Sequence, residues 1–381
     1  MSDYLDCNST TPIDPRVREV VLHFLDVEYG NPASPHDYGR RAKAAVQAAR
    51  DQIAAVVAAR RHEVFFTSGA TESNNLAILG LAAHGEGHGK RHVVSTAIEH
   101  SSVMEPLGEL RRRGFEVAYV APDRGGRVDP AAIVDAVRPD TLLVSMMHVN
   151  NETGVVQAIA GMADLLADRP VFFHVDAAQG FGREIETLRH PRIDLLSVSA
   201  HKIHGPKGVG ALIARRREGR LPPLRPLVFG GGQELGLRPG TLPAALIAGL
   251  GKAAELALNE AAERAAACRE LRQRILGAIE CLRPTIHGHP RHTLPHVLNV
   301  SFPGIFSEDA IESLEGIAAV SNGSACTSAC ATRSHVLTAM GVADEEADGA
   351  IRLSWCHATR LDHLDEMVAA LASLQDEGRG E

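Results

Sequence analysis

The sequence contains few aromatic residues and no CxxC pair of cysteines. Aromatic side chains make up 4% of the 381 residues, against 45% for all hydrophobic residues, so the core must be mainly aliphatic. The six cysteines are scattered, and none follows another after a gap of two residues. This spacing argues against a zinc ribbon or a thioredoxin-type motif. Six scattered cysteines are also too few in a chain of this length for a disulfide framework.

Long apolar runs and an excess of positive charge are also missing. No run approaches the ~20 apolar residues that a membrane-spanning helix needs, and the opening MSDYLDCNSTTP is too polar for a secretory signal. The net charge of −8 argues against a protein that holds nucleic acid by bulk electrostatics. We therefore expect a cytoplasmic protein with no membrane attachment and no direct binding of nucleic acid.

A local cluster of histidines lies in the stretch HGHPRH, at His287, His289 and His292. Three imidazoles at this spacing could hold a metal ion. The Gly and Pro residues among them favour an exposed loop instead. We therefore expect no metal site in this protein.

Short apolar runs alternate with helical stretches over roughly the first 240 residues. Runs such as EVFFTSG, HVVST and TLLVSMMHV are rich in Val and Phe, which is typical of strands buried on both faces. The alternation predicts an α/β fold with a mainly parallel sheet covered by helices on both sides. Farther along, one long amphipathic helix, AALIAGLGKAAELALNEAAERAAACRELRQRIL, leads into a smaller α+β region with strands LNVSF, AAVSN and AIRLSW. We place the domain boundary within that helix, near residue 260.

Polar residues follow five of the predicted strands. In open α/β sheets, ligands bind beyond the carboxyl ends of the strands, so these residues are expected to converge on one edge. Singly, each of them is better explained as a cap or turn residue, but five together favour a binding site. They are Thr67 to Glu72, Glu99 and His100, Asn150 to Gly154, Asp176 and Gln179, and His201 and Lys202.

This set of residues matches the needs of pyridoxal phosphate, which requires an amine, an acid, a stacking ring and a phosphate cradle. Lys202 would bond to the cofactor aldehyde, and Asp176 would pair with the pyridine nitrogen. His100 could stack on the ring and move protons, and Gln179 or Asn151 could bind the phenolic oxygen. The small residues after EVFF would hold the phosphate at a helix N-terminus. Competing phosphate motifs fail, because GEGHGKR lacks the first glycine and the Ser/Thr of a P-loop, and GLGKAA lacks the third glycine of a dinucleotide site.

A series of motifs spans nearly the whole chain in one order: YLDCNSTTP, GNPAS, TSGATESNN, HVNNETGVVQ, HVDAAQ, SAHKIHGPKG, GGGQELGLRPGT, NGSACTSA and AIRLS. With these motifs, the sequence resembles the cysteine desulfurases of the NifS/IscS type, within the class V aminotransferase superfamily. Some of its departures from the usual pattern resemble DndA, the desulfurase type of DNA phosphorothioation. The resemblance implies the pyridoxal-phosphate-dependent transferase fold type I, which is aspartate aminotransferase-like.

The resemblance also implies a division into two domains. Residues 16–260 would form a large cofactor-binding domain around a mainly parallel seven-stranded sheet. Residues 1–15 and 261–381 would form a smaller α+β domain, which carries the catalytic cysteine in a loop at about 321–335.

The roles of individual residues follow from the same resemblance. The implied catalytic residues are Cys326 as the sulfur-accepting nucleophile, Lys202 and His100. The implied cofactor-binding residues are Ala70, Thr71, His100, Asn151, Asp176, Gln179, Ser199, His201, Lys202 and Thr241. Thr241 would reach the phosphate in the partner subunit, which implies a homodimer. The implied substrate-binding residues are Arg352 for the carboxylate, with Asn31, His36 and Asn151.

The resulting prediction is an L-cysteine desulfurase, a sulfurtransferase that produces L-alanine and a persulfide on Cys326. The persulfide would pass to an acceptor protein for iron–sulfur cluster assembly, tRNA thiolation or DNA phosphorothioation, and the sequence does not decide among these. A selenocysteine lyase or another enzyme on the same fold is an alternative, as is a non-catalytic scaffold that binds partner proteins. Cys330, four residues after Cys326, could receive the persulfide or form a protective disulfide, although we favour a bystander.

Overall fold

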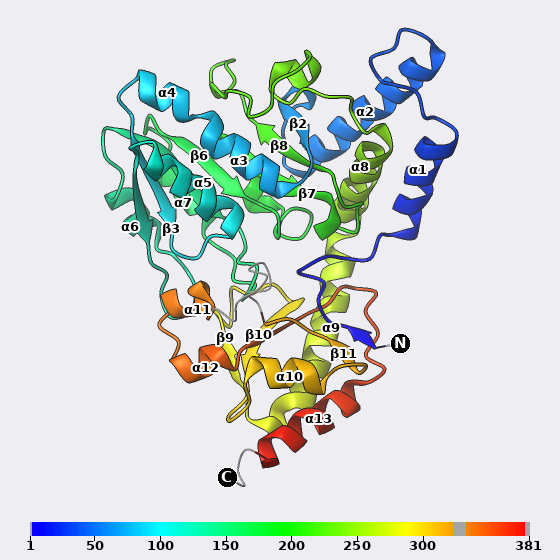
Figure 1. The fold of residues 1–381 in the computed structure, drawn as a ribbon, viewed down its shortest axis with the longest axis vertical. Helices are drawn as coiled ribbons and strands as arrows, with labels where there is room; N and C mark the ends of the chain where they lie inside the picture. The colour runs from blue at the N-terminus through cyan, green and yellow to red at the C-terminus, as the bar shows by residue number, and fades with distance from the viewer. Residues whose placement is uncertain (1, 323–332, 378–381) are drawn as a thin grey trace.

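The computed structural model describes residues 2–322 and 333–377. Its centre is a seven-stranded sheet in the order β2-β8-β7-β6-β5-β3-β4, in the upper part of Figure 1. β8 runs antiparallel to β2 and β7, and every other pair is parallel. The predicted α/β fold with a mainly parallel seven-stranded sheet is thereby confirmed. The strands are β2 (Val64–Thr67), β3 (His92–Thr96), β4 (Glu116–Val120), β5 (Thr141–Met147), β6 (Phe172–Asp176), β7 (Leu195–Ser199) and β8 (Gly210–Ala214).

Helices cover both faces of this sheet. One face packs against α1 (Pro15–Asp26), α2 (Asp37–Val56), α6 (Pro130–Asp135), α7 (Ile159–Leu165) and α8 (Ala244–Asn259). The other face packs against α3 (Ala70–Gly80), α4 (Ala82–Gly87) and α5 (Ser101–Arg112). Neighbouring residues of one strand enter different cores, as Phe65 and Phe66 of β2 do. Burial on both faces explains why these strands are continuous apolar runs instead of alternating ones.

The lower part of Figure 1 holds a smaller antiparallel sheet, in the order β12-β10-β9. Its elements enclose a separate core that includes the fully buried Trp355. The N-terminal strand β1 pairs in parallel with β11 beside this sheet. The remaining elements are β1 (Asp3–Tyr4), α9 (Ala261–Ile279), β9 (Thr285–His287), β10 (Val297–Ser301), α10 (Ser307–Ser313), β11 (Ala318–Ala319), α11 (His335–Ala339), α12 (Asp344–Asp348), β12 (Ile351–Ser354) and α13 (Leu364–Glu377).

The predicted single long helix is interrupted, and that prediction was wrong in this detail. α8 ends at Asn259 and α9 begins at Ala261, because the backbone of Glu260 leaves the helical region with φ −107° and ψ 8°. Figure 1 shows the two helices leading from the upper part of the molecule into the lower part. The division near residue 260 stays a prediction, and α11 and α12 pack against the core of the larger sheet although they follow it in sequence.

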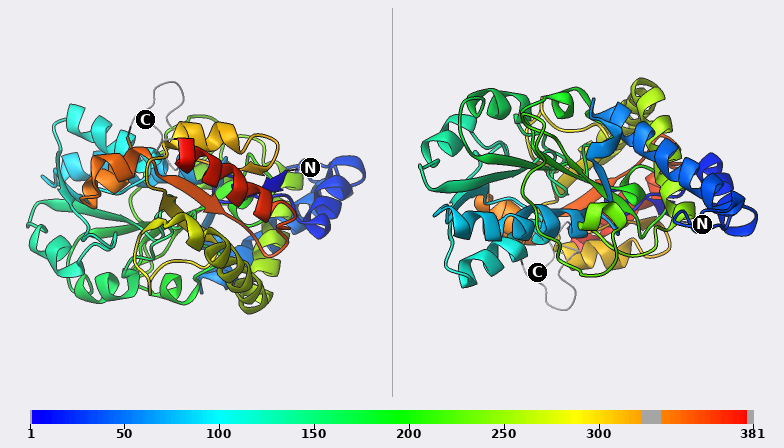
Figure 2. Two further views of the ribbon diagram at one scale, coloured as in Figure 1. Left: turned by 90° about the horizontal axis from the view of Figure 1, so that it is seen from below. Right: turned by 90° about the horizontal axis from the view of Figure 1, so that it is seen from above.

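The longest dimension of the molecule runs from the larger sheet to the smaller one, vertically in Figure 1. Both views in Figure 2 show the blue residues 15–56 at one end and the cyan to teal residues 82–135 at the other. No helix in the described ranges combines the length and the apolar character that crossing a membrane would require.

Candidate active site

A cleft of about 560 Å³ opens at the carboxyl ends of the central strands, where it is also bordered by β12 of the smaller sheet. Most of the residues predicted for the cofactor and the substrate line it together. These are Ala70, Thr71, His100, Asn151, Asp176, Gln179, Ser199, His201, Lys202 and Arg352. Residues that are far apart in sequence therefore form one continuous surface, as the strand-end argument predicts.

Three predicted residues do not line this cleft. Thr241 is exposed and lies outside it, so within one chain it has no contact with the site. Asn31 and His36 are also exposed, and their side chains organise the local backbone. The Asn31 Oδ1 accepts a hydrogen bond from the backbone N–H of Ala33 (2.9 Å), and the His36 Nδ1 accepts one from that of Gly39 (3.3 Å).

The predicted nucleophile Cys326 lies outside the described residues, and so does Cys330. Most of the predicted loop 321–335 is likewise outside them. On its C-terminal side, Ser334 caps α11 and its hydroxyl donates a hydrogen bond to Glu152.

The main-chain oxygens of residues 8 and 9 hold the amine of Lys202. Lys202 lies in a single helical turn directly after β7, and its Nζ donates to the carbonyls of Asn8 and of Ser9 (3.0 Å). Asn8 also accepts at its carbonyl from Gln179 Nε2 (2.9 Å) and donates through Nδ2 to the Asn151 carbonyl (3.0 Å). Asn8 therefore connects three walls of the cleft. Sequence reasoning gave it no role, although its motif YLDCNSTTP was recognised.

The carboxylate of Asp176 is held in a fixed orientation at the end of β6. Its Oδ2 accepts from Asn74 Nδ2 (2.7 Å) and its Oδ1 from the backbone N–H of Ala178 (3.0 Å). Asn74 also donates to the hydroxyl of Ser102 (2.8 Å), which links α3 to α5 beneath the cleft. The Asn74 amide was not singled out from the sequence, where it is one polar residue within TSGATESNN.

The imidazole of His100 acts as the N-terminal cap of α5. Its Nδ1 accepts a hydrogen bond from the backbone N–H of Ser102 (3.1 Å) and lies 2.8 Å from the Ser102 hydroxyl. Because Nδ1 accepts, the ring proton is on Nε2. The cap thus sets both the orientation and the tautomer of the ring that faces the cleft.

The N-terminus of α3 forms one end of the cleft. The turn from Ser68 to Thr71 begins this helix. Its N-cap residue is Gly69, which has no side chain to accept a hydrogen bond from the first backbone amides of the helix. The helix start packs closely against β8, since a Cβ at Gly210 would lie 2.6 Å from the Cα of Gly69. Uncapped amide groups at the positive end of a helix are suited to a phosphate group.

His201 lines the same cleft as a neutral ring. Burial, with the charges of Lys202 and Lys207, lowers the pKa of His201 to about 4. Its Nδ1 lies 3.2 Å from the hydroxyl of Thr10. The ring is therefore positioned as a neutral hydrogen-bonding partner near pH 7.

Glu99 lies behind Asp176 as a fully buried acid. Burial, together with the nearby charge of Asp176, raises the pKa of Glu99 to about 8. Its Oε1 accepts from the Thr96 hydroxyl (2.7 Å) and from the backbone N–H of Met147 (2.8 Å), while its Oε2 is buried without a partner. Glu99 is therefore largely protonated at neutral pH and adds little negative charge beside the Asp176 carboxylate.

Arg352 approaches the cleft from β12. Its Nη2 donates to Asp6 Oδ1 and to the Ser9 hydroxyl (both 2.7 Å), and its Nη1 donates to the Asn151 carbonyl (3.0 Å). Its Nε is buried without a hydrogen-bond partner. A guanidinium held in this way presents a fixed positive group to an acidic ligand.

These residues fit pyridoxal phosphate. The uncapped helix start suits the phosphate, the Asp176 carboxylate suits a protonated ring nitrogen, and Lys202 reaches the cleft with a primary amine. On a mainly parallel seven-stranded sheet, this arrangement defines the class of the protein as a pyridoxal-phosphate-dependent enzyme of fold type I.

The chain belongs to the aminotransferase class-V family, whose profile matches residues 3–367. It is 44% identical to the cysteine desulfurase IscS of Vibrio cholerae serotype O1 over 380 residues, which is 99% of this chain and 93% of that protein. A solved NifS-like protein superposes with a TM-score of 0.91 at 37% identity, covering 99% of this chain and all of the other. DndA from Streptomyces lividans gives a TM-score of 0.82 at 46% identity, over 91% of this chain and 98% of DndA.

Proposed function

We propose that this protein is a cysteine desulfurase that converts L-cysteine to L-alanine and leaves the sulfur as a persulfide on Cys326. The observation that carries the proposal is the shared cleft of Lys202, Asp176 and Arg352. It places an amine, an acid and a carboxylate-binding guanidinium around one small-molecule site. The similarity to IscS over almost the whole chain supports the same reaction.

Arg352 would bind the carboxylate of L-cysteine, since its guanidinium already lies in the cleft and is held by Asp6 and Ser9. Pyridoxal phosphate, when bound, supplies an electron sink that weakens the Cα–H and Cβ–S bonds of the amino acid. Asp176 would hold a proton on the ring nitrogen, because its two oxygens are fixed by Asn74 and Ala178. The buried surroundings strengthen this charge interaction.

Lys202 and His100 are proposed to move protons at the substrate. The Lys202 amine lies at the tip of β7 and can accept a proton from Cα when it is not charged. The His100 ring carries its proton on Nε2, so it can donate that proton to the carbon of L-cysteine that loses its sulfur. General acid–base groups of this kind typically contribute about 10²- to 10⁴-fold to a rate.

The sulfur step needs no outside oxidant. The Cβ–S bond of L-cysteine breaks, and an S–S bond to the sulfur of Cys326 forms. One thiol proton is transferred to Cβ, which becomes the methyl group of alanine. One L-cysteine and one thiol therefore give one L-alanine and one persulfide. A free thiol is only a few per cent ionised at neutral pH, so Cys326 requires a base to activate it.

The same proposal includes a homodimer, an acceptor protein and a cytoplasmic location. The exposure of Thr241, outside its own cleft, supports a role in the site of a second copy. The acceptor protein would remove the persulfide sulfur from Cys326. The names of the similar proteins, IscS and DndA, do not favour a single acceptor for this chain.

The experiment that tests the function measures L-alanine and sulfide released from L-cysteine, with a thiol reductant and the cofactor-loaded protein. We expect equimolar products from the wild type and at least a hundredfold loss in Cys326→Ser. Cys281→Ser, which changes an exposed thiol, is the matched control and should keep full activity. A cofactor-loaded wild type that releases no alanine from L-cysteine would overturn the proposal.

A further inference from the structure

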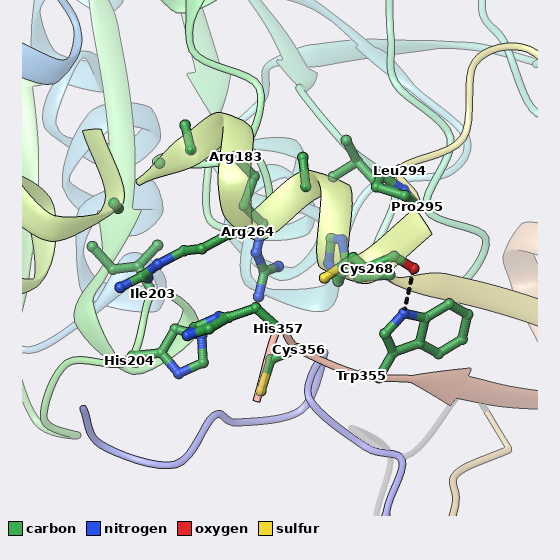
Figure 3. A pocket seen from close by; sticks show the side chains of 15 residues that line it. Arg183, Ile203, His204, Arg264, Cys268, Leu294, Pro295, Trp355, Cys356 and His357 are labelled. Carbon is green, nitrogen blue, oxygen red and sulfur yellow. Dashed lines mark hydrogen bonds between the residues drawn. The ribbon is translucent and has the colours of Figure 1, made fainter. Parts of the chain in front are cut away.

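A second pocket lies apart from the cleft, between α9 and the segment that follows β12. Its volume is about 60 Å³, and Figure 3 shows His204, Cys356 and His357 close together on one side of it. Cys268 lies toward the other end, where its carbonyl accepts a hydrogen bond from Trp355 (3.0 Å). None of these side chains lines the candidate active site.

The three clustered side chains are metal-ligand types. His204, Cys356 and His357 each offer one ligand atom, and these atoms all lie within 4.8 Å of one another. The two imidazole rings are 5.0 Å apart at their centroids and are inclined by 73°. Two nitrogens and one sulfur favour zinc and similar metals over magnesium or calcium, which prefer oxygen ligands.

Hydrogen bonds outside the cluster orient two of these ligands. The Nδ1–H of His204 donates to the Pro12 carbonyl (3.1 Å), which leaves the Nε2 lone pair available. Metal-binding histidines commonly have such a second partner, because it sets the tautomer and the ring orientation. The Thr359 hydroxyl accepts from the backbone N–H of Cys356 (3.0 Å) and donates to the Cys356 sulfur (3.6 Å), and the Cys7 thiol also forms a hydrogen bond with Cys356.

The pocket is also lined by two arginines, Arg183 and Arg264, whose positive charges could bind an anion there instead of a metal ion. The Arg183 guanidinium already donates to the Lys202 carbonyl (2.8 Å) and to Gln179 Oε1 (3.1 Å). Arg264 is paired with Glu260 (2.8 Å). Both guanidinium groups are engaged elsewhere, so the candidate metal ligands that lie together are the two imidazole nitrogens and the Cys356 sulfur.

We propose that His204, Cys356 and His357 bind one transition-metal ion of the zinc class, with water as the fourth ligand. This site departs from the sequence-based expectation of no metal. His204 follows Lys202 by two residues, and Cys356 follows β12, which carries Arg352. A bound ion would therefore tie the turn of the large sheet that bears Lys202 to the smaller sheet. The proposal does not depend on the desulfurase activity.

The test is a cobalt titration of the cofactor-loaded protein after treatment with a chelator. Cys326 and Cys330 are changed to Ser in every sample, so that these thiols cannot bind the probe. We expect one Co²⁺ per chain, with tetrahedral d–d absorption at wavelengths longer than those absorbed by the cofactor. Cys356→Ser and His204→Gln should each weaken Co²⁺ binding at least tenfold. Cys268→Ser is the matched control in the same pocket and should bind Co²⁺ as its parent does.

Folding is checked for each variant by its near-ultraviolet circular dichroism. If Cys356→Ser does not fold, His357→Asn replaces it, since His357 is only half-buried. In addition, Zn²⁺ should raise the unfolding temperature of the parent protein but not that of the ligand variant. Absence of Co²⁺ absorption in the folded parent, or the same absorption in a folded ligand variant, would overturn the proposal.

Discussion

At the scale of single residues, Lys202 and Arg352 both depend on residues 6–9. The Lys202 amine donates to two main-chain carbonyls of this segment, and Arg352 donates to the carboxylate of Asp6 and the hydroxyl of Ser9. The segment therefore positions side chains from two different sheets around one cleft. A change in any of these contacts is expected to affect substrate binding as well as local stability.

Replacement of Arg352 is expected to act mainly on substrate binding. Arg352→Ala should raise the KM for L-cysteine about tenfold or more, because charged hydrogen bonds contribute ~1.5–3 kcal/mol. Arg352→Lys keeps the positive charge without the fork and should give an intermediate KM. Steady-state kinetics with cofactor-saturated protein measure the change. An Arg352→Ala protein that folds and has the wild-type KM would contradict the assigned role.

The buried carboxyl group of Glu99 is expected to make the protein less stable as the pH rises. Its pKa rises from 4.5 to about 8 on folding, because the site is buried and Asp176 is near. The folded protein therefore holds this proton more tightly than the unfolded chain. The associated stability is fully present below pH 4.5 and is lost as the pH rises toward 8, by at most ~1.4 kcal/mol per pH unit.

The isosteric variant Glu99→Gln should show a smaller fall in the free energy of unfolding between pH 5 and pH 8 than the wild type. Urea unfolding at several pH values measures this difference. Glu105→Gln, at an exposed position on the helix α5 that follows Glu99, serves as the control and should follow the wild type. Equal pH dependence in the wild type and Glu99→Gln would show that Glu99 does not titrate in this way.

At the scale of secondary-structure elements, the start of α3 depends on close packing against β8. The backbone at Gly69 and the Cα of Gly210 approach so closely that a Cβ at Gly210 would lie 2.6 Å from the Cα of Gly69. This approach keeps the helix N-terminus directed into the cleft. Glycine at position 210 is therefore needed for this packing, and we expect it to support cofactor binding as well.

Gly210→Ala is expected to lower the free energy of unfolding by ~1–3 kcal/mol, as overpacking does in other cores. It should also speed loss of the cofactor on dilution, because the new Cβ would clash with the Val198 carbonyl and with Gly69, so the end of β7 or the start of α3 must move. Gly161→Ala provides a control, since a Cβ there meets nothing within 4 Å and the site is helical. Its stability should stay equal to the wild type or rise by up to ~1 kcal/mol. Unchanged stability and cofactor retention in Gly210→Ala would argue against the packing account.

Helices, strands and the residues at their ends could be predicted wherever the sequence pattern that defines them lies within one short segment. Apolar runs identified the central strands, and small or polar residues at their ends identified Ala70, Asp176 and Lys202 as neighbours in space. The break at Glu260 was missed because both flanking stretches have good helical patterns. The contact between Asn8 and Lys202 could not be predicted, since the two residues are 194 positions apart and the interaction uses a main-chain carbonyl.

At the scale of the whole molecule, the cleft lies where the larger and the smaller sheet meet. Lys202 and Asp176 come from the larger sheet, and Arg352 comes from the smaller one. The cofactor and the substrate carboxylate would therefore be held by different parts of the fold. In the proposed dimer, Thr241 adds a contribution from a second copy.

A mixed-dimer experiment tests that contribution. Lys202→Ala alone should be inactive, and Thr241→Asp alone should retain cofactor poorly because its charge repels the phosphate. If Thr241 acts on the partner's site, a dimer of the two variants contains one intact site and should recover about half of the wild-type activity. Differently tagged chains, co-expressed and purified by both tags, allow this measurement. No recovery in the purified mixed dimer would place Thr241 outside the partner's site.

The most direct test of the central claim is intact-protein mass spectrometry after one turnover of cofactor-loaded protein with L-cysteine, without reductant or acceptor. The account predicts a mass gain of one sulfur atom per chain, which peptide mapping assigns to Cys326. Cys330→Ser should gain the same sulfur, and Cys326→Ser should not. Sulfur on Cys330 in the wild type, or an undiminished gain in Cys326→Ser, would contradict the claim that Cys326 receives the sulfur.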